Sequence, residues 1–588
     1  MTTALVASHA EALPSASRIA WQPYSNDVFA RAKASHRYVL LDLEAVWCHW
    51  CHVMDATTYH DQAVTTLIAQ RFIPVKVDED SRPDISRRFE IYGWPATILF
   101  DGDGNVIAHY RGYREPEVFR HLLLDALEDP SPLHSQGEDD SDTPFAAHPL
   151  LSEATRAEVD RRFRESLDSV SGGLKQFQKF LDRDTVEYSL WLTELGDAQA
   201  CATLRTTLDA ARQLIDPVWG GMYQYSTDED WIHPHFEKIM SVQANALRIY
   251  SLAYERFKDP AYLDAAQSIH SYLKNFLLSP NGAFYVSQDA DLIPGIHSAS
   301  YFALDDEHRR KRGVPRVDRH IYARENGWAI EALAAYFSAS GDASALDEAR
   351  GAAKWIKRNR RNHDGSYSHD ASTSGGPFLG DSLAMARAFL ALYAVTGDPQ
   401  QLGDARLAAR ALTRFSAHPG SGFLPALPSA TGMLRSSPNI DENIEVARLA
   451  NLLHRYSGEP FAQQLAENAL RYMDTDRIAL HFGAVPGILL ANAEYQNEPL
   501  HITVVGSKND PAARRLFNAA LQVPAMYRRT EWWDPMGPPL FHTDVRFPAM
   551  GRATAFVCSE RSCSLPLFDS QALQEQVAVQ ATDRRAGH

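Results

Sequence analysis

Short apolar runs alternate with amphipathic segments over the first 130 residues. Runs rich in β-branched and aromatic residues predict strands beginning at residue 38 and at 72–77, 96–100 and 106–110. Segments 53–71, 82–92 and 115–128 have the spacing of helices. Asp101-Gly102 between the last two runs favours a β-hairpin. The pattern predicts an α/β domain over residues 1–128.

The chain changes character after residues 129–149, which are acidic and rich in Pro and Ser and therefore predict a linker. Beyond it, amphipathic helices recur in pairs, each pair joined by a short turn. In most of these turns Gly ends one helix, an acid caps the next and Pro or Ala follows. The turns are Gly196-Asp197-Ala198, Lys258-Asp259-Pro260, Gly341-Asp342-Ala343, Gly397-Asp398-Pro399 and Gly458-Glu459-Pro460.

Five helical hairpins are visible in this region, and helices near 151–168 and 478–493 could supply a sixth. Six hairpins that close on themselves make an (α/α)6 toroid with a central funnel, which we expect over residues 150–498. From 499 the pattern changes again: a strand at 500–505, a helix at 511–521 and an irregular or β segment at 541–557 predict a small α/β segment. Residues after about 575 look like a loose tail.

The length and the net charge of the chain narrow the range of possible functions. The 588 residues are too many for one hydrophobic core, so several domains are expected. A net charge of -16 argues against nucleic acid or an anionic membrane as the main partner. Neither a long apolar run nor a secretory leader is evident, and there are only five cysteines, so we expect a cytoplasmic protein.

The strand that begins at residue 38 leads into Cys48-His-Trp-Cys51, the strongest chemical motif in the chain. Two cysteines three apart at a helix start lie at the positive end of the helix dipole, which favours a reactive thiolate. Two other interpretations remain open. Cys48 to His52 also spells the Cys-x-x-Cys-His pattern of haem attachment, and the same groups could hold a metal, although no second ligand pair is spaced nearby.

The elements and residues around the motif resemble the thioredoxin fold. Asp42 lies six residues before Cys48, Trp47 precedes the first cysteine, and Gly93-Trp94-Pro95 resembles the cis-proline loop of that family. The resemblance disfavours the haem interpretation. It implies that an exposed Cys48 attacks a disulfide, that Cys51 resolves the mixed disulfide, and that Asp42 accepts the proton of Cys51.

Four neighbours of the cysteines are expected to tune the pair: His49, Trp50 and His52 within and after the motif, and Trp94 before Pro95. His49 and Trp50 replace the Gly-Pro usual in thioredoxins. A nearby imidazolium would lower the thiolate pKa, so we expect a more oxidising pair than that of thioredoxin.

Four longer segments closely resemble the thioredoxin-domain proteins related to spermatogenesis-associated protein 20. Besides the Cys-x-x-Cys motif, they are residues 76–84 (Lys-Val-Asp-Glu-Asp-Ser-Arg-Pro-Asp), 231–238 (Trp-Ile-His-Pro-His-Phe-Glu-Lys), 287–291 (Ser-Gln-Asp-Ala-Asp) and 555–566. The resemblance implies a thioredoxin-like domain fused to a six-hairpin, glycosidase-like toroid. The chain departs from the family at Tyr92-Gly-Trp-Pro95 and near Gly172-Gly173, which lacks the usual Pro-Lys-Phe-Pro.

Polar residues where the inner helices should begin are candidates for a funnel site. They are His233, His235, Glu237, Asp289, Asp291, Glu325, Asn326, Asp381, Asp441 and Glu442. Paired carboxylates could act on a sugar as acid and base, and the histidines could transfer protons in an epimerase. Equally, these groups could cap helices and bind one another. The aromatic residues Tyr223, Trp231, Phe284, Tyr285 and Trp328 could stack on a sugar or belong to the core.

Cys558 and Cys563 could pair with each other, relay electrons for the first pair, or pack as small apolar groups; we favour the last because their spacing lacks the Cys-x-x-Cys geometry. The sequence as a whole predicts a thiol–disulfide oxidoreductase that needs no cofactor or metal. Its partners would be a disulfide-bearing protein or small thiol, with a sugar-like molecule in the toroid. The alternatives are a sugar epimerase, isomerase or glycoside hydrolase with a structural thioredoxin domain, and a redox-sensing binding protein.

Overall fold

The computed structural model describes residues 19–133, 145–372, 376–427, 434, 436–481, 483–543, 545–559 and 562–586. The chain forms two compact units. The first contains Met1–Glu79, Phe89–Gln136 and Pro294–Ile296, and the second contains Asp80–Arg88, Gly137–Ile293 and His297–His588. Part of the predicted linker, residues 134–144, lies outside the described residues.

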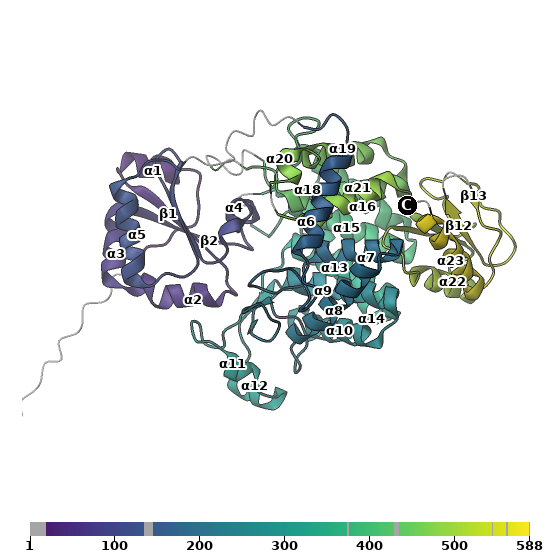
Figure 1. Ribbon diagram of the computed structural model, residues 1–588, viewed down its shortest axis with the longest axis horizontal. Helices are drawn as coiled ribbons and strands as arrows, with labels where there is room; N and C mark the ends of the chain where they lie inside the picture. The colour runs from purple at the N-terminus through teal and green to yellow at the C-terminus, as the bar shows by residue number, and fades with distance from the viewer. Residues whose placement is uncertain are drawn as a thin grey trace, which may run out of the picture. The chain divides into compact units, whose positions relative to one another are not determined.

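The first unit is built on a four-stranded sheet of order β2-β1-β3-β4. Figure 1 labels its strands β1 and β2. β1 is parallel to β2 and antiparallel to β3, which pairs with β4. Leu40 and Leu99 face a core that includes Ile68 and Leu123, whereas Phe29 meets Phe100 on the opposite face. Helices therefore cover both faces of the sheet. The elements are α1 (Val28–Ala34), β1 (Tyr38–Glu44), α2 (His49–Ala56), α3 (Gln62–Arg71), β2 (Phe72–Asp78), β3 (Ala96–Phe100), β4 (Val106–Arg111) and α5 (Pro116–Glu128).

Two predicted helices are divided in the structure. The predicted helix 53–71 is broken after α2 by the 3-10 turn η1 (Thr58–His60), because Asp61 starts a new helix by accepting hydrogen bonds from the backbone N–H groups of Ala63 and Val64, both at 2.9 Å. The predicted helix 82–92 is α4 (Pro83–Phe89) followed by the 3-10 turn η2 (Glu90–Tyr92).

The helical part of the second unit is a closed ring, as predicted. Six inner helices contact one another in chain order, and the last contacts the first. The inner helices are α7 (Arg183–Leu195), α9 (Met240–Phe257), α13 (Ala323–Ser340), α15 (Leu379–Thr396), α18 (Ile440–Ser457) and α21 (Pro486–Gln496). The outer helices, each packed on an inner one, are α8 (Ala198–Ala211), α10 (Pro260–Tyr272), α14 (Ala343–Asn359), α16 (Pro399–Ala411), α19 (Pro460–Met473) and α6 (Glu153–Ser166). This is an (α/α)6 toroid, and α6 with α21 forms its sixth pair.

The turns between paired helices end one helix and cap the next, as their sequences predict. Gly196 ends α7 in the left-handed conformation with φ 97°, which costs glycine little. Asp197 then caps α8 by accepting the N–H of Ala200 at 2.9 Å.

Short elements connect the ring helices. They are β5 (Tyr225–Ser226), β6 (Pro234–His235), β7 (Lys238–Ile239), β8 (Ser287–Gln288), β9 (Val317–Asp318), α11 (Ala299–Phe302), α12 (Asp306–Arg312), α20 (Asp476–Ala479), the 3-10 turns η4 (Arg212–Leu214) and η6 (Leu412–Phe415), and the π-helical turn η5 (Leu273–Leu277).

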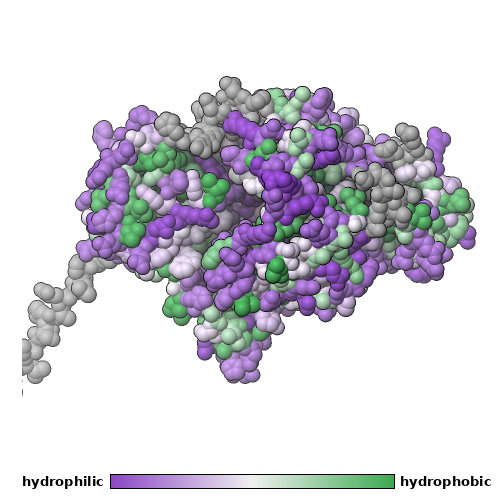
Figure 2. Space-filling view, viewed as in Figure 1, coloured by the Kyte–Doolittle hydropathy of each residue, from purple (hydrophilic) through white to green (hydrophobic). Residues whose placement is uncertain are grey.

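Among the helices within the described ranges, only α15 is long and apolar enough to cross a membrane, with a mean hydropathy of 1.2 over 18 residues. Its neighbours explain this composition, because 78% of the helix is buried and it contacts α13, α16 and α18. On the face drawn in Figure 2, polar residues predominate and apolar residues form small scattered patches.

A second mixed sheet follows the ring helices in the chain, with strand order β11-β10-β12-β13. Figure 1 labels its strands β12 and β13. The prediction of a loose tail after about residue 575 is wrong, because a helix extends to residue 586. Its residues Leu573 and Val577, one helical turn apart, are buried. The elements are β10 (Leu500–Val505), α22 (Pro511–Leu521), β11 (Arg528–Trp533), β12 (Thr554–Ser559), β13 (Ser562–Cys563) and α23 (Ser570–Ala586).

Candidate functional site

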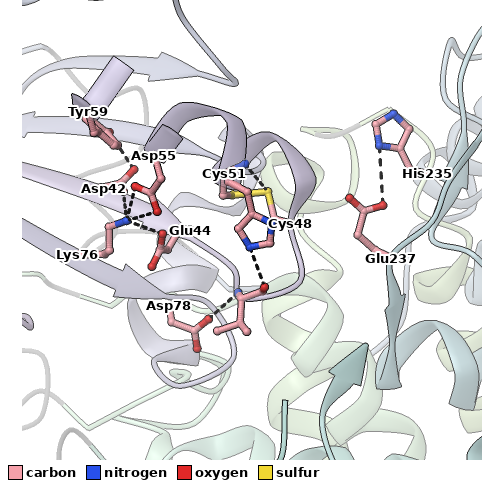
Figure 3. Close-up of a disulfide and its surroundings, with 12 residues drawn as sticks. Asp42, Glu44, Cys48, Cys51, Asp55, Tyr59, Lys76, Asp78, His235 and Glu237 are labelled. Carbon is pink, nitrogen blue, oxygen red and sulfur yellow. Dashed lines mark hydrogen bonds and ion pairs between the residues drawn. A yellow bond between two sulfur atoms is a disulfide. The ribbon is translucent and has the colours of Figure 1, made fainter. Parts of the chain in front are cut away.

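Cys48 and Cys51 lie where β1 leads into α2. Cys48 is the N-cap of α2, and its Sγ accepts the backbone N–H of Cys51 at 3.1 Å. A disulfide joins the two residues, whose Cα atoms are 5.3 Å apart (Figure 3). In the reduced pair, this N–H and the helix dipole would both stabilise a Cys48 thiolate.

Both cysteines of the motif are buried, so the expectation that Cys48 is exposed is wrong. Cys48 is 4% exposed and Cys51 3%. Trp47 is also buried and packs edge to face against Trp94 at 5.8 Å. The Trp94–Pro95 peptide bond is cis, as the resemblance implied.

The other residues of the motif have distinct surroundings. Trp50 is 41% exposed and stacks on Tyr113 at 5.6 Å. His49 is buried and its ring meets the edge of Trp50 at 5.2 Å. His52 Nε2 lies 3.1 Å from the carbonyl oxygen of Val46, so His52 helps to hold the loop that precedes Cys48.

Asp42 belongs to a group of charged side chains around Lys76, which we call the Lys76 cluster (Figure 3). Asp42 on β1 stands opposite Lys76 on β2 in the sheet register. Lys76 Nζ lies 3.4 Å from Asp42, 2.7 Å from Glu44 and 2.8 Å from Asp55. The hydroxyl of Tyr59 donates to Asp42 Oδ1 at 3.0 Å. The cluster therefore contains three carboxyl groups and one ammonium group.

Burial raises the pKa of Asp42 from an ordinary 3.8 to about 7, although Lys76 opposes the shift. Burial also raises the pKa of Glu44. For Lys76, burial alone would lower the pKa, but the three carboxylates outweigh it and raise the value. Asp42 can consequently gain or lose a proton near neutral pH. The carboxylates of Asp42, Glu44 and Asp55 are close enough to hold a metal ion, but the Lys76 ammonium already supplies a cation there.

In the toroid, the side chain of Asn326 fixes a turn of the backbone. Its side-chain amide accepts the N–H of Phe284 at 2.7 Å and donates to the carbonyl of the same residue at 3.0 Å. Gln243 makes the same pair of bonds to Met222, and Asn443 makes them to Phe423. Each amide lies in the first turn of an inner helix and fixes the preceding Gly-aromatic turn.

Three other predicted acids lie at the starts of neighbouring inner helices. Glu325 Oε1 accepts hydrogen bonds from the guanidinium of Arg324 at 2.8 and 2.6 Å. Asp381 Oδ1 accepts the backbone N–H of Arg324 at 3.0 Å. A Cβ on Gly380 would lie 3.0 Å from Glu442 Oε1 and 3.1 Å from Arg324 Cδ, so Glu442 belongs to the same group. Glu325, Asp381, Glu442 and Arg324 make up what we call the acidic mouth.

The acidic mouth contains two buried oxygens without a hydrogen-bond partner in the described chain, Glu325 Oε2 and Asp381 Oδ2. The sequence did not single out His369, whose Nδ1 lies 2.8 Å from Asp381 Oδ1 and whose Nε2 lies 2.7 Å from the carbonyl of Asp80. Burial alone would lower the pKa of His369, but the Asp381 carboxylate raises it overall. Because each ring nitrogen of His369 faces a hydrogen-bond acceptor, the imidazolium form, which can donate from both nitrogens, is favoured.

The remaining candidates lie elsewhere in the toroid unit. His233 is exposed and binds Asp230 at 2.8 Å, and Asp441 is exposed. His235 Nδ1 lies 3.8 Å from the buried Glu237 (Figure 3).

Asp289 and Asp291, the acids of segment 287–291, are both buried. The N–H of Asp291 donates a hydrogen bond to Asp289 Oδ1 at 2.8 Å, so the two residues form a turn within one loop.

Most of the aromatic candidates belong to the core. Tyr223, Trp231 and Phe284 are buried, and Tyr285 and Trp328 pack partly buried against the same core. The guanidinium of Arg324 lies over the Trp328 ring at 4.8 Å, so Trp328 is beside the acidic mouth.

The ring interior holds an ion-pair network that the sequence analysis missed. Glu187, fully buried on α7, lies 3.0 Å from Arg183, 2.7 Å from Arg248 and 2.8 Å from Arg448. The whole network, four arginines and four glutamates from all six inner helices, is Arg183, Glu187, Arg248, Glu331, Arg387, Glu445, Arg448 and Glu494. The one sign of this network in the sequence was the spacing of Arg183 and Glu187, which lie four residues apart and so face each other on a helix.

Residues 7–118 match a family model described as Thioredox_DsbH, protein of unknown function, DUF255. The chain is similar to human spermatogenesis-associated protein 20, with 28% identity over 309 residues, 47% of this chain and 39% of that protein. The match thus spans about two fifths of that relative's length. Over 100 residues, 16% of each chain, it is 35% identical to the thiol:disulfide interchange protein DsbD of Ralstonia nicotianae. A solved D-mannose isomerase matches 58% of this chain and 96% of its own, with 13% identity and a TM-score of 0.46.

Proposed function

We propose that this chain, which carries a domain of the Thioredox_DsbH (DUF255) type, is a thiol–disulfide oxidoreductase that acts through Cys48 and Cys51. The observation that carries the proposal is the geometry of the pair. Cys48 caps α2, receives the N–H of Cys51 on its sulfur, and can form a disulfide with Cys51. The similarity to a protein named for thiol:disulfide interchange supports it.

In the reduced protein, the Cys48 thiolate attacks one sulfur of a substrate disulfide. A mixed disulfide forms on Cys48, and the other substrate sulfur leaves as a thiolate that takes a proton from water. The Cys51 thiol then loses its proton and attacks the Cys48 sulfur, which releases the second substrate thiolate. The substrate gains two electrons and the Cys48–Cys51 disulfide forms.

Asp42 is the proton acceptor for Cys51 in this scheme. A carboxyl group with a pKa of about 7 is deprotonated in a large fraction of molecules at neutral pH and still holds a transferred proton well. Lys76 keeps the deprotonated form accessible, because its ammonium lies 3.4 Å from the carboxylate.

His49 and Trp50 between the cysteines set the redox direction in our proposal. His49 directly follows Cys48 and is buried, and a histidine next to a cysteine favours its thiolate. We expect a reduction potential higher than that of thioredoxin, measured by equilibration with a glutathione redox buffer. A potential at or below about −270 mV, the thioredoxin value, would refute this part.

Insulin-disulfide reduction by the full chain tests the proposal. Cys201 is the one cysteine outside a disulfide among the described residues, so Cys201→Ser is the matched control. Wild type and Cys201→Ser should reduce insulin, and Cys48→Ser should not. Cys51→Ser should accumulate a mixed disulfide with insulin. Equal insulin reduction by Cys48→Ser and wild type would overturn the assignment.

The acidic mouth supports a second candidate function, a sugar-processing site in the toroid. Glu325 Oε2 and Asp381 Oδ2 are buried acceptors without a hydrogen-bond partner in the described chain, and sugar hydroxyls are donors that would satisfy them. Their carboxyl groups and His369 could then carry acid–base chemistry of the epimerase or hydrolase kind.

A panel of free hexoses and disaccharides, titrated by calorimetry into the full chain, tests this second candidate. Glu325→Gln and Asp381→Asn should abolish binding of any sugar that wild type binds. The exposed Asp441→Asn, also near the start of an inner helix, should leave binding intact. Equal binding by all three variants would exclude the acidic mouth as the sugar site.

A further inference from the structure

The second cysteine pair is a disulfide, which corrects the expectation that its members merely pack as small apolar groups. Cys558 on β12 and Cys563 on β13 stand directly opposite each other in the antiparallel register, with their Cα atoms 4.0 Å apart. Residues 560 and 561, between these two strands, lie outside the described residues. The bond therefore joins the two sides of a β-hairpin at its tip.

The two sulfurs of this hairpin differ in access. Cys558 is 2% exposed and packs in an apolar cluster with Val505, Phe547 and Phe556. Cys563 is only partly buried, and its strand is the outermost of the four-stranded sheet. A thiol from solution can reach Cys563 much more readily than Cys558.

The hairpin has backbone bonds that do not depend on the disulfide. The N–H of Ser564 donates to the carbonyl of Val557 at 2.8 Å, and Ala555 and Leu567 exchange two bonds at 2.7 and 3.0 Å. Opening the S–S bond would thus release the tip and leave the base of the hairpin paired. Because Cys563 is partly accessible, Cys558 is buried and the base of the hairpin is paired independently, the bond can open and close without unfolding the sheet.

We propose that Cys558 and Cys563 form a second thiol–disulfide centre, separate from Cys48 and Cys51, that exchanges with small monothiols of the glutathione class. A thiolate attacks Cys563 Sγ, the S–S bond breaks, and Cys558 leaves as a thiolate that takes a proton from water. The thiolate of a second small thiol then attacks the small-molecule sulfur of the mixed disulfide, and Cys563 leaves as a thiolate that takes a proton from water. Two protein thiols and one small disulfide result, so the two electrons come from the two small thiols. In the reverse direction, Cys558 is the resolving cysteine.

The test uses the full chain with Cys48→Ser, Cys51→Ser and Cys201→Ser, so that only the second pair remains. Reduced and oxidised glutathione are the probes, and maleimide labelling followed by intact mass counts the thiols. We expect no labelled thiol under oxidised glutathione and two under excess reduced glutathione, in one reversible two-electron transition. Two thiols at every ratio, or none at any ratio, would overturn the proposal.

Two further variants in the same background separate the roles of the cysteines. Cys558→Ser should leave Cys563 as a partner for glutathione and accumulate one stable glutathione adduct. Cys563→Ser leaves the buried Cys558 and should react at least 10-fold more slowly. Both variants lack the disulfide, so any loss of stability is shared between them. Equal adduct formation by the two variants would contradict the assignment of Cys563 as the attacked sulfur.

Discussion

Replacing Asp42 by Asn should stabilise the sheet of the first unit, and the gain should grow as the pH rises. The carboxyl group is 1% exposed, and its pKa rises from 3.8 to about 7 on folding. A raised carboxyl pKa means that the folded state binds more protons than the unfolded state between these two values. Stability from this group is therefore fully present below pH 3.8 and is lost as the pH rises through 7.

The size of this loss follows from the two pKa values. A rise of about three units in the pKa of Asp42 lowers the free energy of unfolding by about 4 kcal/mol once the carboxyl group is ionised in both the folded and the unfolded state. About 2.5 kcal/mol of this loss falls between pH 5 and pH 8. Asn keeps the shape of Asp42 and a hydrogen bond to Tyr59 but cannot ionise. Lys76 retains its ion pairs with Glu44 and Asp55.

Amide hydrogen exchange of the oxidised full chain measures this effect locally, because a chain of several units does not unfold in one step. The free energy of opening of β1 and β2 should be higher in Asp42→Asn than in wild type. The difference should widen by about 2.5 kcal/mol between pH 5 and pH 8.

The matched control is Asp27→Asn. Asp27 is an exposed residue beside α1 whose pKa is lowered by its hydrogen bond with Ser25, so it stays ionised through this pH range. A difference between Asp42→Asn and wild type that is constant with pH, or that shrinks as the pH rises, would refute the pKa assigned to Asp42.

Three further predictions concern other parts of the chain. Glu187→Gln should lower the free energy of unfolding of the toroid by about 3–5 kcal/mol in urea titrations, because it leaves buried arginines unpaired. The control Glu158→Gln removes only exposed ion pairs and should leave the unfolding transition nearly unchanged. Asn326→Ala should cost about 1–3 kcal/mol by leaving Phe284 without its partner, seen as faster exchange of the Phe284 amide. Reduction of the Cys558–Cys563 bond should lower the opening free energy of the hairpin by about 2 kcal/mol, the value for so short a loop.

Local sequence signals predicted the architecture well because the forces behind them are local. Gly196 and Asp197 specify a helix end and a helix start whatever surrounds them, and the same turn chemistry recurs around the ring. Asp42 was also recognisable, because its distance along β1 from Cys48 fixes its place in the sheet.

The interior of the ring could not be predicted in this way. Whether Glu331 faces the axis depends on how six helices rotate against one another, and its partners Arg183 and Arg387 are distant in sequence. The turn-fixing bonds of Asn326 could not be predicted for a similar reason, since a polar residue at the start of an inner helix can serve a funnel or a neighbouring turn. His369 lies outside the inner helices and becomes notable only through its contact with Asp381.

Cys48 was expected to be exposed because attack on a protein disulfide requires access. Cys48 is buried instead, as is its neighbour Trp47, which packs against Trp94, and the sequence carried no measure of this burial. The misjudged Cys558 shows the same limit, because pairing across a hairpin depends on strand register.

The most direct test of the central claim is a single turnover that follows both partners. The fully reduced chain is mixed with one equivalent of insulin, quenched by alkylation, and the peptide that contains Cys48 and Cys51 is analysed by mass spectrometry. The account predicts that this peptide becomes a disulfide, with one insulin disulfide reduced for each pair oxidised. Insulin reduction while Cys48 and Cys51 remain alkylated thiols would contradict it.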